Sequence, residues 1–173
     1  MSGTLGFGLR FALLFALLTT GFEASRGSTF EQFVVADLIL TPAAEAINFV
    51  TPEQRIEVHE RTLISAQGSR LHITRGCEGI EMFLLLISAV AAFPAPLSRR
   101  LLGLILGSAL AYVLSIGRLM ALQYILSYWP AAWEGAHGLI LPLAPIVLIA
   151  VFFLWWCRSD ATLPPLTRNT HAG

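Results

Sequence analysis

Four long apolar stretches alternate with shorter polar segments along the chain. Each approaches the ~20 helical residues that are needed to cross the hydrocarbon core of a membrane. The pattern therefore predicts an all-α polytopic membrane protein with about four transmembrane helices. The first stretch lacks the small residues of a signal-peptidase cleavage site, so we interpret residues 1–22 as a retained anchor. The predicted spans are residues 5–22, 79–97, 101–127 and 138–157.

The segment of residues 23–76 is less uniformly apolar. Within it, residues 30–50 are apolar but include Asp37 and Glu45. Because a charge at the centre of a bilayer costs several kcal/mol, we expect an interfacial amphipathic helix there rather than another span. Apolar and polar residues then alternate on both sides of residues 66–69, which predicts a small β-hairpin before the second span.

The positions of the arginines predict the orientation of the spans. Arg99 and Arg100 lie in the short turn of residues 94–100, where two prolines separate the second span from the third. Short loops rich in Arg face the cytoplasm, so both termini should be cytoplasmic and residues 23–76 extracytoplasmic. The polar tail of residues 158–173 contains a Pro-Pro pair and no periodicity, which indicates disorder.

Composition supports a membrane protein and excludes several other classes. Of 173 residues, 55% are hydrophobic and only 13% are charged, whereas soluble domains have about a quarter charged residues. The 11 basic residues balance 11 acidic ones, and no basic stripe or zinc-finger spacing favours nucleic-acid binding. The two cysteines, Cys77 and Cys157, are predicted about 30 Å apart, too far for a disulfide.

Three reactive side chains are predicted at one membrane depth. A helix rises 1.5 Å per residue, so 18 to 22 residues cover about one hydrocarbon thickness. Cys77 lies 22 residues before Arg99, Arg118 lies 18 residues after Arg100, and His137 opens the fourth span. All three should therefore lie at the outer boundary, although depth alone does not establish that they touch.

Each of the three residues has a functional and a structural interpretation. Cys77 precedes a predicted helix, whose amide groups favour a thiolate and can form an oxyanion hole, but free cysteines are commonly packing residues. Arg118 lies inside an apolar span, where it serves a function, snorkels, or pairs with Glu78 or Glu81. His137 can transfer protons or simply lie at the interface. Together, thiol, cation and base are the components of an activated cysteine nucleophile.

These residues resemble the motifs of the exosortase/archaeosortase family of polytopic membrane cysteine transpeptidases. The resemblance rests on the run from Gly76 to Ile80 at the outer start of a span, on Arg118 near the outer end of the next, and on His137 after it. It covers residues 50–157. The chain departs from the family by having Ser115 where an asparagine is common, and by having fewer spans than many members.

The resemblance implies a role for each residue of the predicted membrane core, residues 77–157. Cys77 is the nucleophile, Arg118 steadies the thiolate or oxyanion, and His137 is the acid/base. The substrate is a secreted protein with a C-terminal motif, a hydrophobic span and an Arg-rich end, cleaved through a thioester and transferred to an unknown acceptor. The enzyme lies in the plasma (inner) membrane among its lipids, and no metal or organic cofactor is implied. Residues expected to support the site or the substrate are Glu78, Gly79, Glu81 and Ser115.

Two other classes remain open from the sequence. The chain can be a non-catalytic membrane scaffold in which Arg118 pairs with Glu81 and Cys77 is a packing residue. Glu81 is one helical turn from Cys77, so either interpretation accommodates it. A small transporter with Arg118 as an anion site is less favoured, because the discontinuous repeated helices of such folds are missing from the sequence pattern.

Overall fold

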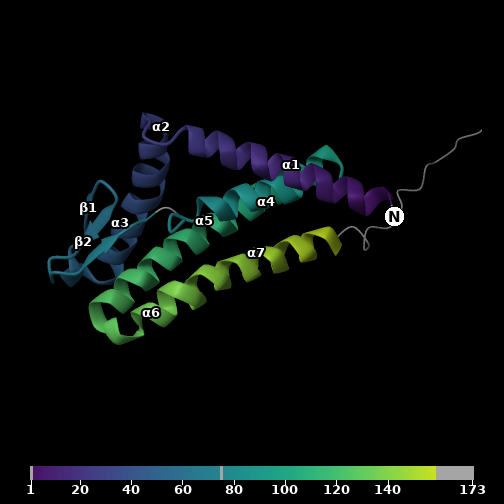
Figure 1. The fold of residues 1–173 in the computed structure, drawn as a ribbon. Coiled ribbons are helices and arrows are strands. Elements are labelled where there is room, and N and C mark those ends of the chain that lie inside the picture. Colours follow the sequence, from purple (N-terminus) through teal and green to yellow (C-terminus); the bar gives the residue numbers. More distant parts are fainter. Residues whose placement is uncertain (1, 75, 159–173) are drawn as a thin grey trace, which may run out of the picture.

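The structure, a computed structural model, describes residues 2–74 and 76–158 and is mostly helical (Figure 1). Four helices lie alongside one another, and consecutive ones run in opposite directions. The start of α1, the turn between α4 and α5, and the end of α7 therefore lie together at what we call the inner end. The small sheet lies at the opposite, outer end. These helices are α1 (Ser2–Ala24), α4 (Ile80–Ala92), α5 (Leu97–Tyr128) and α7 (Leu141–Arg158).

Four helical segments among the described residues are long and apolar enough to cross a membrane. Three of them contain the predicted spans that begin at residues 5, 101 and 138. The tail predicted to be disordered, residues 158–173, lies outside the described residues beyond Arg158. The four segments are Leu5–Ala24, Thr29–Val50, Leu97–Tyr128 and Pro130–Arg158.

The predicted span of residues 79–97 is wrong in length. Helix α4 has 13 residues, which at 1.5 Å per residue is about 20 Å and shorter than a hydrocarbon core. It ends because Phe93 adopts an extended backbone before Pro94, a residue that cannot continue a helix. The turn predicted at residues 94–100 is present but shorter, because α5 begins directly after Pro96 and already contains Arg99 and Arg100.

The helix predicted at residues 30–50 is present as one continuous helical segment, and its position relative to a membrane remains a prediction. It comprises α2 (Thr29–Gln32), a π-helical stretch η1 (Phe33–Leu40) and α3 (Thr41–Val50). Figure 1 shows this segment running across the direction of α5 and α7, at the outer end and beside the sheet. Although its length would allow it to span a membrane, this crosswise direction is the one expected for a helix lying in the interface.

The predicted hairpin is a three-stranded antiparallel sheet in the order β1-β2-β3. The turn at residues 66–69 is confirmed, but the strand predicted before it folds back at Glu60, which has a φ of 53°. The register pairs Leu63 with both Val58 and Leu71, so apolar residues face the core together. The strands, which follow the short helix η2 (Pro52–Gln54), are β1 (Glu57–His59), β2 (Thr62–Ile64) and β3 (Arg70–His72).

Short helical turns connect α5 to α7 at the outer end. They are η3 (Pro130–Ala132), α6 (Trp133–Gly135) and η4 (Ala136–Ile140). At the inner end, Arg99 donates hydrogen bonds to the carbonyls of Trp156 and Cys157, the latter at 3.1 Å. These carbonyls belong to the last turn of α7, where a cation is favoured by the helix dipole. The first turn of α5 is thus fixed to the end of α7.

Candidate active site

Cys77 lies in the turn that joins β3 to α4. Gly76 and Gly79 on either side of it both have positive φ, at 83° and 85°, a conformation that glycine adopts without steric cost. The backbone N–H of Cys77 donates to the carbonyl of Thr74 at 3.0 Å, which closes the turn. The two glycines therefore shape the segment that carries the thiol to α5.

The thiol contacts the buried guanidinium of Arg118. Nη2 of Arg118 lies 3.8 Å from Sγ of Cys77, and Arg118 is 8% exposed. Two residues predicted to share a depth are therefore in contact, although they lie 41 positions apart. A further contact, which the sequence did not suggest, comes from Thr74, whose hydroxyl donates to the same sulfur at 3.5 Å. Both hydrogen-bond donors stabilise negative charge on sulfur.

Arg118 makes no ion pair with any carboxylate that the structure describes. The scaffold alternative predicted a pair with Glu81, but the described residues show no ion pair between the two side chains, and that of Glu81 is exposed. The Nε atom of Arg118 is also buried and has no hydrogen-bond partner among these residues. A buried cation with no counter-ion among the described residues is costly, and the hydrogen-bond acceptor that the structure gives Arg118 is the sulfur of Cys77.

Glu78, the neighbour of Cys77, belongs to a separate charged group. Its side chain is completely buried and accepts a hydrogen bond from Arg26 at 3.0 Å, while Arg61 forms a second ion pair with it. Glu31 contacts the same two arginines at 3.0 and 2.8 Å. We call Arg26, Glu31, Arg61 and Glu78 the outer ion cluster. It fixes the Cys77 turn to the α1–α2 connection and to the sheet.

The hydrogen bonds of this cluster lower the pKa of Glu31 to about 2, with the bond from the backbone of Gly27 contributing most. Glu31 also accepts a hydrogen bond from the backbone N–H of Gly27 at 2.6 Å. The hydrogen bond between Arg26 and Glu23 raises the pKa of Arg26, with Glu31 adding to the effect. The sequence gives little indication of this cluster, because its members come from four different segments and Arg26 lies 52 positions before Glu78.

Gly79, the residue before α4, packs closely against Ser115 of α5. A Cβ atom at Gly79 would lie 2.4 Å from Oγ of Ser115 and 3.0 Å from Cε of Met82. Ser115 is 1% exposed and donates to the carbonyl of Ala111 at 2.9 Å. These two predicted supporting residues therefore set how closely the Cys77 turn approaches α5 and, three residues further along, Arg118.

His137 is not joined to the thiol by a hydrogen bond. It lies in η4, where its ring stacks on Trp133 with centroids 4.9 Å apart and an interplanar angle of 6°. Within the described part of the chain, Nδ1 of His137 is buried and has no hydrogen-bond partner. The structure thus brings Cys77 and Arg118 together and holds His137 on the neighbouring outer segment.

Comparisons of the chain with models of protein families, with curated proteins and with solved structures found no match. The resemblance to exosortases therefore rests only on the residues of the predicted motif. The geometry contains a thiol in contact with a buried guanidinium that no described carboxylate pairs with, at the outer end of a bundle of apolar helices. An arrangement of this kind is suited to nucleophilic chemistry at a membrane surface.

Proposed function

We propose that the protein is a membrane-embedded cysteine transpeptidase or peptidase of the exosortase kind. The observation that carries the proposal is the contact between Cys77 and Arg118, because Arg118 is buried and no described carboxylate neutralises it. A cation in such a place stabilises a thiolate, which is the reactive form of cysteine. A purely structural arginine would be expected to pair with an acidic side chain.

The proposed reaction begins with attack of the Cys77 thiolate on a peptide carbonyl of the substrate. The carbonyl oxygen becomes an oxyanion, which the guanidinium of Arg118 and the hydroxyl of Thr74 stabilise as hydrogen-bond donors. The peptide C–N bond then breaks, and His137 supplies the proton that the departing amine requires. A thioester at Cys77 remains, and an acceptor nucleophile resolves it.

We place the outer end, with Cys77, at the extracytoplasmic face of the plasma (inner) membrane. Arg99 and Arg100 lie at the inner end, and short arginine-containing turns favour the cytoplasmic side. The start of α1 and the end of α7 lie at that same end, so both ends of the helical bundle would be cytoplasmic (Figure 1). A secreted substrate would then reach Cys77 from outside.

An apolar groove beside the Cys77 turn supports a substrate that carries a hydrophobic span. It has a volume of about 380 Å³ and lies between the α2–η1 segment and helices α4 and α5. Ile80, the first residue of α4, joins the groove to the turn. A substrate helix docked there would hold its motif near the thiol and make the attack nearly intramolecular. The lining residues are Phe22, Phe30, Val34, Leu38, Ile39, Ile80, Phe83, Leu84 and Tyr112.

The proposal can be tested with a secreted protein from the same genome that ends in a motif, a hydrophobic span and an Arg-rich tail. Co-expression with this protein should remove the tail, and Cys77→Ala should abolish the cleavage at unchanged membrane levels. Cys157→Ala is the matched control, because Cys157 lies at the inner end and is also a free thiol. Normal processing in the Cys77→Ala variant would overturn the proposal and favour a scaffold.

A further inference from the structure

Glu81 is a second charged residue close to the thiol that the proposed reaction does not use. It occupies the first turn of α4, its side chain is exposed, and it makes no hydrogen bond or ion pair with any residue that the structure describes. It is the one charged residue lining an apolar crevice of about 70 Å³ between α1, α4 and α7. The other lining residues are Phe15, Met82, Leu85, Ile146 and Ile149.

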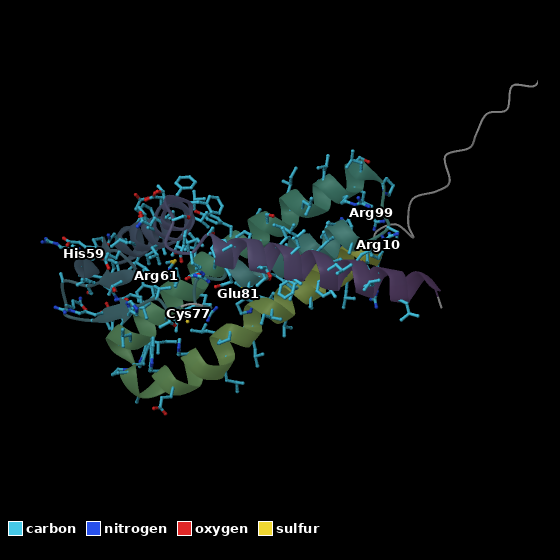
Figure 2. All side chains as sticks on the ribbon, turned by 45° about the horizontal axis from the view of Figure 1, so that its top comes forward. Arg10, His59, Arg61, Cys77, Glu81 and Arg99 are labelled. Atoms are coloured by element: carbon cyan, nitrogen blue, oxygen red, sulfur yellow. The ribbon has the colours of Figure 1, made fainter. Side chains whose placement is uncertain are left out.

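The carboxylate lies close to the backbone that precedes Cys77. Oε1 of Glu81 is 3.8 Å from the position that a Cβ atom on Gly76 would occupy. Figure 2 shows Cys77 and Glu81 at the same end of the bundle, far from Arg10 and Arg99. The carboxylate of Glu81 therefore lies beside the turn that carries Cys77, whereas Arg118 contacts the thiol itself. An ionisable side chain among apolar helices is costly unless a partner or a function accounts for it.

We infer that Glu81 binds the ammonium group of an amine that resolves the thioester at Cys77. This inference rests on the proposed function and adds the chemical class of the acceptor. The carboxylate attracts a cation to the turn that carries Cys77, and the apolar crevice beside it accommodates the first carbons of an alkyl stem. A neutral acceptor such as an alcohol or water would gain nothing from the charge.

The transfer step begins at the ammonium group of the acceptor. Glu81 takes one proton from the ammonium, and the neutral nitrogen attacks the thioester carbonyl carbon. A C–N bond forms, the C–S bond breaks, and Cys77 leaves as a thiolate beside Arg118. The second proton lost by the nitrogen passes to His137. The products are an amide and the free enzyme, and no oxidant or reductant is required.

The test uses the full-length protein in lipid nanodiscs with Cys157→Ser, acylated at Cys77 by p-nitrophenyl acetate. Release of p-nitrophenolate counts the acyl-enzyme, and ethylamine or hydroxylamine is then added. Ethylamine is a cation at neutral pH, whereas hydroxylamine is neutral. Glu81→Gln should slow formation of N-ethylacetamide about tenfold or more relative to the hydroxylamine reaction, since a charged hydrogen bond is lost.

The hydroxylamine rate also reports whether each variant keeps a folded, acylated site. Glu134→Gln removes an exposed carboxylate from the same outer end and should change neither rate. Glu81→Asp keeps the charge and should retain a preference for ethylamine. Equal ethylamine rates in wild type and Glu81→Gln, or equal losses with both nucleophiles, would overturn the inference alone. Failure of Cys77 in the wild type to acylate would overturn the proposed function as well.

Discussion

Two groups of buried charge lie at the outer end and differ in how their charges are balanced. In the outer ion cluster, Arg26 and Arg61 each contact Glu31 and Glu78, so two cations meet two anions. Arg118 instead contacts the sulfur of Cys77 and no described carboxylate. Figure 2 shows Arg61 and Cys77 in the same part of the molecule. The same residue type therefore has two different roles within one small region.

The difference separates structural from chemical use of a buried arginine. In the balanced cluster, every charge has a partner, and the removal of one member leaves another uncompensated. At Cys77, the missing counter-ion leaves the positive charge available to a thiolate. Such a site costs stability and is retained where function requires it. The two groups should consequently respond in opposite directions to loss of charge.

The largest expected effect is in the balanced cluster. Glu78→Gln keeps the shape of the side chain but leaves Arg26 and Arg61 short of one anion, which should lower the free energy of unfolding by about 3 to 5 kcal/mol. Equilibrium unfolding in mixed detergent micelles measures this change in the free energy of unfolding. Glu134→Gln, at an exposed position, should change stability by less than ~0.5 kcal/mol. Equal effects of the two substitutions would show that the cluster has no structural role.

A smaller loss is expected at the contact between Gly79 and Ser115. Gly79→Ala places a methyl group against Oγ of Ser115 at a φ of 85°. Overpacking and backbone strain should together lower the free energy of unfolding by about 1 to 3 kcal/mol. Adding Ser115→Gly removes the clash but not the strain, so the double variant should recover part of the loss. No recovery would indicate that the contact is unimportant.

Removing the charge of Arg118 should raise stability slightly. Arg118→Met fills a similar volume without a buried, unpaired cation, so we expect the free energy of unfolding to increase by about 1 kcal/mol. The same micelle assay compares it directly with Glu78→Gln. A loss of several kcal/mol would mean that Arg118 has a structural partner, and the contrast between the two groups would disappear.

The smallest effect is expected at Thr74. Thr74→Val keeps the shape but removes the hydroxyl that donates to Sγ of Cys77 at 3.5 Å. Because the side chain is exposed and the bond is long, the rate of Cys77 alkylation should fall only about two- to threefold. Thr62→Val, in the sheet, is the control. A tenfold loss would give Thr74 a role as large as that of Arg118.

Much of the fold follows from the sequence, and its errors have local physical causes. The apolar runs of α1, α5 and α7 are unambiguous because each is long enough to outweigh the few arginines or prolines that it contains. The helix now seen at Ile80–Ala92 was predicted too long because its apolar residues continue through Phe93, while the backbone must already become extended before Pro94. The turn at Glu60 was missed because no glycine or asparagine marks it.

For the site residues, the sequence predicts the depth along the membrane normal but not which side chains lie next to one another. Helical rise placed Cys77 and Arg118 at one depth, and the structure brings them into contact. Lateral neighbours depend on how helices pack, which no local pattern encodes. The partners of Glu78 illustrate this, because Arg26 is 52 positions away and belongs to a different segment. The stacking of His137 on Trp133 follows from helical spacing, but its distance from the thiol does not.

The reactivity of Cys77 towards a membrane-impermeant maleimide in sealed cells tests the central claim most directly. In a Cys157→Ser background, we predict rapid labelling that slows about tenfold or more in Arg118→Ala, since loss of the cation disfavours the thiolate. Arg70→Ala, which removes an exposed charge from β3, should leave the rate unchanged. Labelling only after solubilisation of the membrane, or at the same rate with and without Arg118, would contradict the account.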